Sequence, residues 1–515
     1  MRNIPLPIFD YIRHTWRVMT RSHKTLLTAA SDPKFKPAAD GRWSVYVAKD
    51  TSLEAVEKHL RDEMPPADFE KIRLRPLPSD PMHIHEHGLL YLPRQYVVPG
   101  GRFNEMYGWD SFFIQMGLLR DGEFELAKDL ADNFLYEVLE YGKVLNANRT
   151  YYLTRSQPPF LTQMILAIYR HSRDEQWLKD AIPALEEYHR FWTIPPHCVE
   201  KVALSRYFDL GEGPAPEAAF SERDERGHTS YDAMRRHFRD RHNAGFHAGS
   251  HYHSANDALT PHFYKGDRSM RESGFDPSDR FGPFSADITH YAPVCLNSLL
   301  YQMEIDLAEI HGLLDHAAKR NCWLRLAGER AETINALMWC PNDGLYYDWN
   351  FADARMRPYP FLTTFYPLWT GIASRAQAAQ VAGNLKKFEC PGGLQTSTVS
   401  SGCQWDSPLG WAPLQWIAIE GLRRYGFHRE ANRISRKFLK MVTREFSKYG
   451  TIVEKYDVAR CSADVSSHLK YGYHSNEPGF GWTNGVFTAL YDALHGDDQK
   501  QLMTPLAPSA DPLMI

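Results

Sequence analysis

The sequence predicts an all-α protein built from consecutive helical hairpins. Apolar residues recur at intervals of three or four positions, as at Leu126, Leu130 and Phe134, and this spacing places them on one face of a helix. The helical segments follow one another in pairs with short links, which make paired helices antiparallel neighbours. Stretches with the two-residue alternation of β-strands are few. Together these observations favour a helical fold with little sheet.

Residues 1–98 are expected to form an N-terminal extension that packs on the main domain. The elements in this part are mixed in type. A helix is expected at 8–30 and a short strand at 43–48, and residues 64–81 are rich in proline.

Three histidines lie near the end of this extension. His83, His85 and His87 alternate as the residues of a strand do, which would place their imidazoles on one face. Three imidazoles on one face could hold zinc, and this alternative stays open. A surface strand that leads into the next loop is the simpler expectation.

The helical pairs begin at residue 111. Gly122 and Gly142 follow the first two helices, as is typical of helix ends. The five predicted pairs are 111–122 with 123–142, 160–170 with 175–192, 293–314 with 317–339, 362–373 with 376–388, and 411–425 with 429–446. With a last helix at 483–494 and the N-terminal helix, they come close to six pairs.

Two irregular segments interrupt the pairs. Residues 197–287 are a long insertion rich in Arg, Asp and His; it is expected to contain little helix and is too long for an idle connection. Residues 454–481 are similarly irregular. Both segments are expected to lie over a pocket, and residues 497–515 are expected to form a C-terminal tail.

Composition and charge exclude several classes of partner. Hydrophobic residues make up 43% of the 515 residues and charged residues 24%, which is the balance of a globular protein. A net charge of −4 gives no basic surface for nucleic acid or anionic lipid. No run of 18 apolar residues is present to span a membrane.

The cysteines indicate a reducing compartment. The seven cysteines are an odd number, widely spaced and without a CxxC pair. They are expected to be reduced thiols of a cytoplasmic protein and not a disulfide framework. The first residues contain scattered charges and no apolar core of a signal peptide, which favours the same location.

Two stretches combine aromatic and polar residues in a way that suits a sugar. In residues 99–113, PGGRFNEMYGWDSFF, Arg102 and Asp110 supply hydrogen-bonding groups while Tyr107 and Trp109 supply flat apolar faces. A sugar ring offers a rim of hydroxyls and apolar C–H faces to such a set. Residues 404–413, QWDSPLGWAP, repeat the Trp-Asp pair with further aromatics.

These stretches resemble the two signature motifs of the trehalases, the inverting glycoside hydrolases that split α,α-trehalose into two glucoses. The resemblance runs from about residue 99 to 484. It implies an (α/α)6 barrel, or toroid, over residues 99–496, with long loops over one mouth and no cofactor. The expected substrate is a disaccharide or another small α-glucoside, bound by a monomer or a small homo-oligomer.

Inverting hydrolysis requires a carboxylic acid that protonates the leaving oxygen and a carboxylate that activates water, about 6.5–9.5 Å apart. RESGFD, residues 271–276, resembles the family's acid motif and assigns the acid to Asp276. EKYD, residues 454–457, resembles the segment of the base and assigns that role to Glu454. Read without the family, Asp276 before a proline is also a plausible turn residue, and Glu454 beside a lysine is common on surfaces.

Substrate contacts follow from the same resemblance. NANRTYYLTRSQPP, residues 146–159, closely matches a family motif whose polar residues bind sugar hydroxyls. The residues assigned to substrate binding are Arg102, Phe103, Tyr107, Trp109, Asp110, Asn146, Arg155, Gln157, Glu217, Arg271, Gly274, Trp405, Asp406 and Glu477.

Two positions depart from the family pattern. Ala215 stands where many members have Arg, although the fungal neutral trehalases also lack that Arg, and Asp267 with Arg268 resembles the same branch. Pro478 stands where an acidic residue is usual, with Glu477 displaced by one position. These departures concern the leaving-group side, so hydrolysis of an α-glucoside is better supported than its exact identity.

Three alternatives remain. The first is hydrolysis of another α-glucoside, such as glucosylglycerate, and the second is a catalytically silent sugar-binding protein. The third is a metal hydrolase that uses His242, His247, His251 and His253, although their spacing matches no familiar metal motif. No metal is expected.

Overall fold

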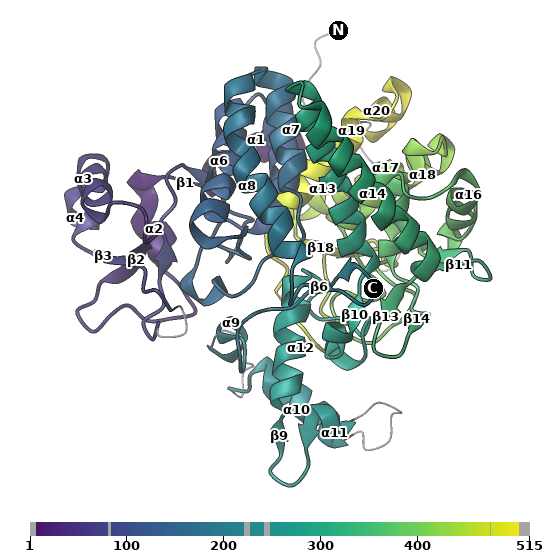
Figure 1. The fold of residues 1–515 in the computed structure, drawn as a ribbon, viewed down its shortest axis with the longest axis horizontal. Coiled ribbons are helices and arrows are strands. Elements are labelled where there is room, and N and C mark those ends of the chain that lie inside the picture. Colours follow the sequence, from purple (N-terminus) through teal and green to yellow (C-terminus); the bar gives the residue numbers. More distant parts are fainter. Residues whose placement is uncertain (1–6, 81–83, 221–226, 241–247, 474, 504–515) are drawn as a thin grey trace, which may run out of the picture.

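The computed structural model describes residues 7–80, 84–220, 227–240, 248–473 and 475–503. Helices form most of the body in Figure 1, while a small sheet with short helices lies at one side and a group of helices from the 197–287 insertion lies below. The general expectation of a helical protein is therefore confirmed, with two additions that the sequence analysis missed.

Six helices contact one another in cyclic order. Each packs against the next along the chain, and the last packs against the first. They are α5 (Gly108–Arg120), α7 (Leu161–Ser172), α13 (Val294–Leu313), α15 (Tyr366–Thr370), α17 (Ala412–Arg424) and α19 (Gly481–Asp492).

Each of the first five is followed by a second helix, which confirms the predicted pairs. These second helices are α6 (Phe124–Tyr141), α8 (Glu175–Thr193), α14 (Ala317–Met338), α16 (Arg375–Gly383) and α18 (His428–Tyr449). The N-terminal helix α1 (Pro7–Met19) contacts α19, which has no following partner of comparable length. The link after α6 turns at Gly142, which is left-handed with φ of 74°, a conformation that glycine adopts without strain.

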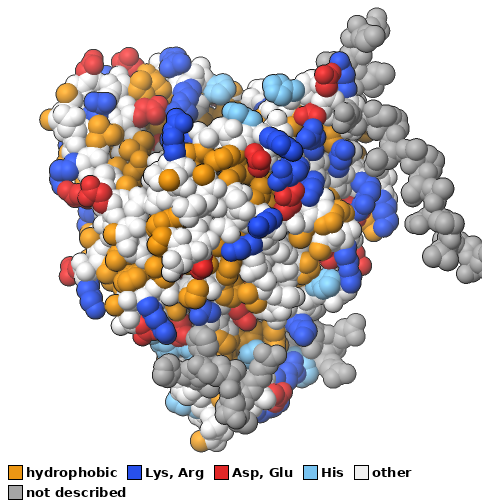
Figure 2. All heavy atoms as spheres, turned by 90° about the vertical axis from the view of Figure 1, so that its right-hand side faces the viewer, with side chains coloured by type: hydrophobic (Ala, Val, Ile, Leu, Met, Phe, Trp, Pro, Cys, Tyr) orange, Lys and Arg blue, Asp and Glu red, His pale blue; other side chains and the backbone are white. Residues whose placement is uncertain are grey.

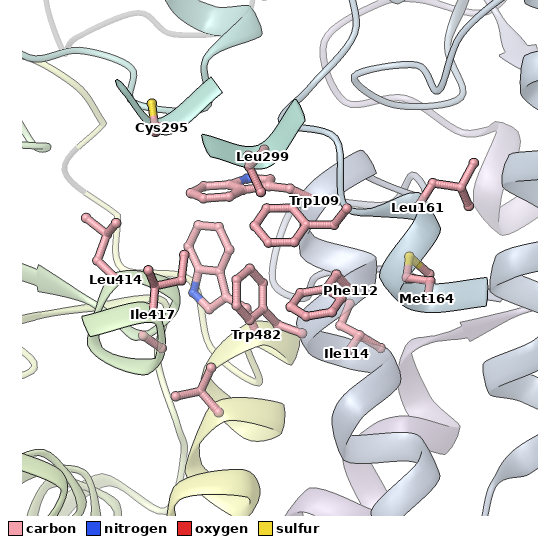
Figure 3. Packing of buried hydrophobic residues seen from close by; sticks show 14 of the residues in the cluster. Trp109, Phe112, Ile114, Leu161, Met164, Cys295, Leu299, Leu414, Ile417 and Trp482 are labelled. Atoms are coloured by element: carbon pink, nitrogen blue, oxygen red, sulfur yellow. The ribbon is translucent and has the colours of Figure 1, made fainter. Parts of the chain in front are cut away.

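Large apolar side chains of α5, α7, α13, α17 and α19 lie near one another (Figure 3). Trp109 and Phe112 of α5 lie near Leu161 of α7 and Trp482 of α19, and all four are buried. The helices α5 and α19 approach closely at Gly485. Any side chain at this position would collide with the carbonyl of Phe113.

The expected helix at 8–30 is wrong beyond Met19. Strand β1 (Thr20–Arg21) interrupts it by pairing with β5 (Tyr96–Val97), and helix α2 (Leu26–Ala30) follows. The pairing partner lies more than 70 residues away, so local periodicity carries no sign of the break.

The expected strand at 43–48 is confirmed as β2 (Trp43–Val47), and it forms a three-stranded parallel sheet. Its neighbours β3 (Ile72–Pro76) and β4 (Leu89–Leu90), with helix α3 (Leu53–Glu63) between β2 and β3, were not expected. The strand expected at the three histidines is wrong for His85 and His87, which lie in irregular backbone. His83 lies outside the described residues.

The insertion at 197–287 contains more helix than expected. Its helices are α9 (Pro216–Phe220), α10 (Ser230–Asp240), α11 (Ala248–His251) and α12 (Pro261–Glu272). Thr260 begins α12 by accepting a hydrogen bond from the Phe263 amide, and Pro261 occupies the first position, both favourable starts for a helix. The polar composition concealed these helices, since their apolar faces are narrow.

The remaining strands are two or three residues long and join loops between helices. One pair matters for the site, β17 (Leu409–Trp411) with β18 (Lys455–Asp457), because it joins the two irregular segments around residues 404 and 454. Among the described helices, none has the length and apolar character needed to cross a membrane.

The cysteines and the surface charges were also addressed by the sequence analysis. All seven cysteines are unpaired. On the face shown in Figure 2, Lys and Arg side chains gather in the upper right part, with a few acidic side chains among them.

Candidate active site

A pocket opens among the loops that precede five of the six cyclically packed helices, α5, α7, α13, α17 and α19. Its empty volume is about 990 Å³, counted with the part open to solvent. Both assigned catalytic residues, Asp276 and Glu454, line it. So do Arg102, Phe103, Tyr107, Trp109, Asp110, Asn146, Arg155, Gln157, Glu217, Arg271, Gly274 and Trp405.

Aromatic rings form one wall of this pocket. Trp405 stacks on Trp411 with ring centroids 3.8 Å apart, and Trp109 lies 5.9 Å from Trp405. Trp482 meets Trp109 edge to face at 5.7 Å. The four indoles come from three separate segments, and they present a rigid apolar surface of the kind that sugar C–H faces pack on.

Asp276 follows helix α12 through a tight turn at Gly274. This glycine has φ of 76°, and a side chain there would come within 3.1 Å of the Trp109 indole. Phe275 packs between Trp109 and Trp405. The turn therefore fixes the Asp276 carboxyl against the aromatic wall.

The surroundings of Asp276 favour its protonated form. Burial raises the pKa of this carboxyl to about 7, although the cations of Arg271 and Arg155 act in the opposite direction. Arg271 Nη1 lies 3.7 Å from Asp276 Oδ2, and desolvation outweighs this attraction.

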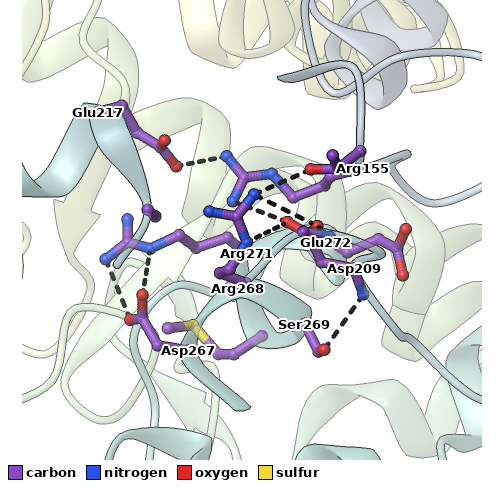
Figure 4. A network of polar contacts seen from close by, with 12 residues as sticks. Arg155, Asp209, Glu217, Asp267, Arg268, Ser269, Arg271 and Glu272 are labelled. Atoms are coloured by element: carbon purple, nitrogen blue, oxygen red, sulfur yellow. Dashed lines mark hydrogen bonds and ion pairs between the residues drawn. The ribbon is translucent and has the colours of Figure 1, made fainter. Parts of the chain in front are cut away.

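A network of arginines and carboxylates supports the floor of the pocket (Figure 4). Arg271 donates to both oxygens of Asp267, at 3.0 and 3.2 Å. The Tyr231 hydroxyl donates to the same carboxylate at 2.6 Å. Because Asp267 is fully buried, this fork holds the Arg271 guanidinium in one orientation.

Arg155 and Glu217 form the second charged pair of the floor. Arg155 donates to Glu217 Oε1 and lies 3.7 Å from Asp209 Oδ2. Burial raises the pKa of Glu217, but Arg155 and Arg271 outweigh it and hold the pKa at about 2. Glu217 is therefore a charged acceptor throughout the neutral range.

Glu454 directly precedes strand β18, and both of its carboxyl oxygens have partners. Lys455 Nζ lies 3.1 Å from Oε2, and the Tyr473 hydroxyl donates to Oε1. The Trp482 indole N–H donates to the Glu454 carbonyl at 3.0 Å. Burial raises the pKa of Glu454, while the lysine and the hydroxyl act against the rise.

Asp110 lines the same pocket and interacts electrostatically with both carboxyl groups. Its pKa is raised well above the usual value by burial, and next by the charges of Glu454 and Asp276. A carboxyl held neutral can donate a hydrogen bond as well as accept one.

Two of the assigned substrate-binding residues are absent from the described lining of the pocket. Asp406 is fully buried and accepts hydrogen bonds from the Tyr359, Ser397 and Ser401 hydroxyls, at 2.7, 2.7 and 2.6 Å. It also accepts a hydrogen bond from the Asp279 amide at 2.9 Å, so both of its carboxyl oxygens hold neighbouring loops together.

Glu477 contacts Arg102, which lines the pocket. It accepts a hydrogen bond from the Arg102 amide at 2.9 Å and lies 3.4 Å from the Arg102 Nε. The structure thus gives both Asp406 and Glu477 contacts that position their neighbours in the pocket wall.

The two departures from the family pattern also lie outside the described lining. Ala215 is fully buried, and its amide donates to the Tyr231 hydroxyl at 2.8 Å. Pro478 is exposed and pairs with Val453. Neither residue offers a side chain to the pocket.

Sequence reasoning missed several residues of the lining. Tyr473, Tyr152, Gln404, Trp482, Lys34 and Met234 all take part in it. Tyr473 has a recognisable signal, since it is an aromatic residue in the irregular 454–481 segment. Lys34 has none, because it comes from the N-terminal extension.

The histidines group differently from the expected set. His242 and His247 lie outside the described residues. His251 lies beside His262 and Asp287, and the ligand atoms of these three residues are all within 4.8 Å of one another. His253, in strand β8 (Tyr252–His253), is exposed.

Comparison with known proteins gives a consistent result. The trehalase family profile matches residues 15–494. The chain is 35% identical to the cytosolic neutral trehalase of Kluyveromyces lactis over 80% of its own length and 58% of that protein. It is 34% identical to the periplasmic trehalase of Salmonella choleraesuis, over 79% of this chain and 69% of that one.

Solved structures show the same likeness. The neutral trehalase of Saccharomyces cerevisiae matches with a TM-score of 0.79 and 30% identity, over 98% of this chain and 97% of that one. A mannosylglycerate hydrolase of Thermus thermophilus matches in fold alone, with a TM-score of 0.50 and 17% identity over 76% and 95% of the two chains. The chain spans only a little over half the length of several full-length fungal relatives.

Proposed function

Because this chain belongs to the trehalase family, we propose that it hydrolyses α,α-trehalose to two glucose molecules with inversion at one anomeric carbon. The observation that carries the proposal is the pairing of two carboxyl groups in one sugar-sized pocket. Asp276 and Glu454 both line it, and their partners differ in the way that an acid and a base require.

Asp276 is the general acid of this proposal. Its pKa of about 7 leaves a proton on the carboxyl near neutral pH, which is then available for the glycosidic oxygen. As the bond to the anomeric carbon breaks, the leaving glucose takes that proton.

Glu454 is the general base. A water molecule between this carboxylate and the sugar attacks the anomeric carbon from the face opposite the leaving group, and Glu454 accepts its proton. Lys455 and Tyr473 contact the two oxygens of Glu454 and favour its charged form, so it can act as a base.

The remaining groups of the pocket bind and orient the sugars. The indole wall takes the apolar ring faces, while Arg155, Arg271 and Glu217 meet the hydroxyls at the floor. Asn146 and Gln157 lie beside the first residues of α5. There, Gln157 Oε1 accepts a hydrogen bond from the Trp109 amide at 2.9 Å. Asp406 and Glu477 act through the residues that they hold.

The domain boundaries form part of the proposal. Residues 99–496 would close into an (α/α)6 barrel, for which the cyclic contacts of α5, α7, α13, α15, α17 and α19 give support. Residues 1–98 would be an extension on this barrel and 497–515 a tail. The described part of the extension is integrated with the pocket, since Lys34 lines it.

The cell location and the partners follow from the relatives. The fungal relatives are named cytosolic neutral trehalases, and we propose a cytoplasmic location for this chain. The substrate is a small disaccharide, and the proposed chemistry needs no cofactor, nucleic acid or membrane. A monomer or a small homo-oligomer would suffice for this chemistry, because the pocket draws on one chain.

Hydrolysis of another α-glucoside, such as glucosylglycerate, is the second candidate. The sequence argument for it rested on Ala215 and Pro478. Since neither residue belongs to the described lining of the pocket, trehalose is favoured. A silent sugar-binding protein is disfavoured by the presence of both carboxyl groups with complementary surroundings.

Proton NMR of the purified protein with α,α-trehalose tests the proposal. Signals of α- and β-glucose in equal amounts within minutes of mixing are expected, because inversion converts one of the two α-linked residues. Early α-glucose alone would show retention and contradict the mechanism. Intact trehalose would contradict the substrate, and glucosylglycerate would be assayed next. Asp276→Asn protein at the same concentration controls for a contaminating trehalase.

A further inference from the structure

A cluster of two imidazoles and one carboxylate lies outside the active-site pocket. His251 ends helix α11, His262 is the second residue of α12, and Asp287 follows the short helical turn at residues 283–285. Among the residues that the structure describes, the lining of the pocket includes none of these three. The cluster therefore has no part in the chemistry proposed above.

A short hairpin brings the two histidines together. Strands β8 and β9 (Ala258–Leu259) pair in antiparallel register, and the Thr260 amide donates to the His251 carbonyl at 3.0 Å. Thr260 also begins α12, so the chain places His262 one turn from the end of the hairpin. The two imidazole rings lie parallel within 18°, with centroids 5.2 Å apart.

The distances fit a single metal ion. His251 Nε2 lies 3.1 Å from Asp287 Oδ1, and His262 Nε2 lies 3.9 Å from the same oxygen. Tetrahedral zinc with bonds of about 2.0–2.1 Å to nitrogen and oxygen separates its ligand atoms by about 3.3 Å. The observed separations bracket this value, so small side-chain rotations suffice to bring the three atoms to one ion.

The most buried imidazole, that of His251, contacts the Asp287 carboxylate at 3.1 Å, but not with the geometry of a hydrogen bond. The side chain of His251 is fully buried, and within the described residues neither of its ring nitrogens has a hydrogen-bond partner of acceptable geometry. A buried polar nitrogen without a partner is costly. Nε2 points toward the space that Asp287 and His262 also face, and a metal ion there would satisfy it.

We propose that His251, His262 and Asp287 form a binding site for a divalent transition metal ion of the zinc type. Two imidazoles and one carboxylate suit zinc, while calcium and magnesium prefer oxygen ligands. The side chains of His262 and Asp287 are 35% and 21% exposed, which leaves room for water as the fourth ligand. The ion joins the start of α12 to residue 287 and thereby stabilises the helix that carries Arg271.

Zinc binding to the full chain tests the site. Protein treated with EDTA and returned to metal-free buffer is dialysed against zinc chloride, and bound zinc is measured by mass spectrometry. One tightly held zinc ion per chain is expected in the wild type. Because loss of an outer-shell partner already costs about 10- to 100-fold in metal affinity, His262→Ala and Asp287→Asn should each weaken binding by at least that factor.

His253→Ala is the matched control. This exposed histidine is two residues from His251 and lies outside the cluster, so the variant should keep the tight zinc ion. Equal zinc retention by wild type and His262→Ala would overturn the site. Displacement of zinc by an equal concentration of calcium would also overturn it, since that would indicate oxygen ligands.

Two measurements do not depend on the folding of the Asp287 variant. Cobalt added to the stripped wild-type protein should give the intense visible bands of four-coordinate cobalt, and zinc should abolish them. The wild-type Tm should rise with zinc concentration, because a ligand that binds only the folded state stabilises it, while the Tm of His262→Ala should not. Weak six-coordinate cobalt bands with a Tm insensitive to zinc would contradict the proposal.

Discussion

At the scale of single residues, the two carboxyl groups that we propose as acid and base differ in what surrounds them. Burial against the aromatic wall holds the proton on Asp276. Glu454 is only 2% exposed, whereas the Asp276 side chain is 33% exposed. Glu454 contacts an ammonium and a hydroxyl that oppose the rise of its pKa. Asp276 therefore keeps its proton near neutral pH, while two contacts of Glu454 oppose the rise of its pKa that burial causes.

The pH dependence of kcat/KM should report the acid. The reaction needs the protonated form of Asp276, whose pKa in the folded protein is about 7, so kcat/KM should fall as the pH rises through about 7. Initial rates on trehalose between about pH 5 and 9 check this expectation. A rate that stays constant from about pH 6 to 9 would contradict the assignment of the acid.

Removal of either carboxyl should abolish most of the activity. Asp276→Asn and Glu454→Gln each remove one proton transfer while they preserve shape, and each should lower kcat by at least about 10²- to 10⁴-fold. Asp464→Asn, which changes an exposed carboxyl in the 454–481 segment, should leave kcat unchanged. Near-native rates in either catalytic variant would exclude that residue from the mechanism.

Tyr473 should act by positioning Glu454. Its hydroxyl donates to Oε1 and lowers the pKa of the base, so Tyr473→Phe should raise that pKa and move the acidic limb of the pH profile to higher pH. The exposed Tyr449 supplies the control Tyr449→Phe. An unchanged acidic limb in Tyr473→Phe would show that the contact has no effect on the base.

The site could be predicted as far as its motifs reach. Asp276, Glu454 and the polar residues of the 146–159 stretch stand in recognisable patterns, and the structure brings them to one pocket. Asp406 stands in an equally clear pattern, yet its carboxylate accepts hydrogen bonds from three hydroxyls of the protein and does not line the pocket. A motif records which residues go together, and the fold decides which of them face the ligand.

At the scale of elements, the turn after α12 places Asp276 next to the wall of indole rings. Gly274→Ala should destabilise the protein by about 1–3 kcal/mol, because it forces a side chain into left-handed backbone and against Trp109. Activity should fall as well, since Asp276 is two residues away. Urea denaturation and trehalose hydrolysis measure the two effects.

Gly328→Ala is the control, and it should change the stability of the protein in the opposite direction. This glycine lies inside α14, and a side chain there would meet nothing within 4 Å. Alanine should stabilise the helix by about 0.5–1 kcal/mol without a change in activity. Equal stability of the two variants would show that the turn at Gly274 carries no strain.

The helical pairs were predictable because their signals are local. A stripe of apolar residues and a glycine at the end are present within each segment. The sheet of β2, β3 and β4 has no such signal, since its pairing joins positions far apart in the chain. The helices α10 and α12 were hidden by their charge, although Tyr231, Met234 and Phe238 give α10 a narrow buried face.

At the scale of the whole molecule, the N-terminal helix α1 packs on the cyclically packed helices α5 and α19. The Trp16 indole is buried, packs against Gly117 of α5 and donates to Asp121 at 2.9 Å. Trp16→Ala should lower the free energy of unfolding by about 3–5 kcal/mol.

Val18→Ala is the control for that change, because Val18 is exposed on the same helix. Urea denaturation of both variants, monitored by circular dichroism, gives the two differences. A loss below about 1 kcal/mol for Trp16→Ala would show that the extension is only loosely attached.

The contact between α5 and α19 has a consequence for synthesis of the protein on the ribosome. About 360 residues separate these helices in the chain, and elongation at about 5–20 residues per second takes roughly 20–70 s to cover that distance. During this interval the largely apolar α5, of which ten residues end up buried, can pack against α6 and α7 but lacks α19, its most extensive contact. The face of α5 that α19 covers therefore stays exposed until α19 emerges, and depletion of chaperones should reduce the yield of the native protein.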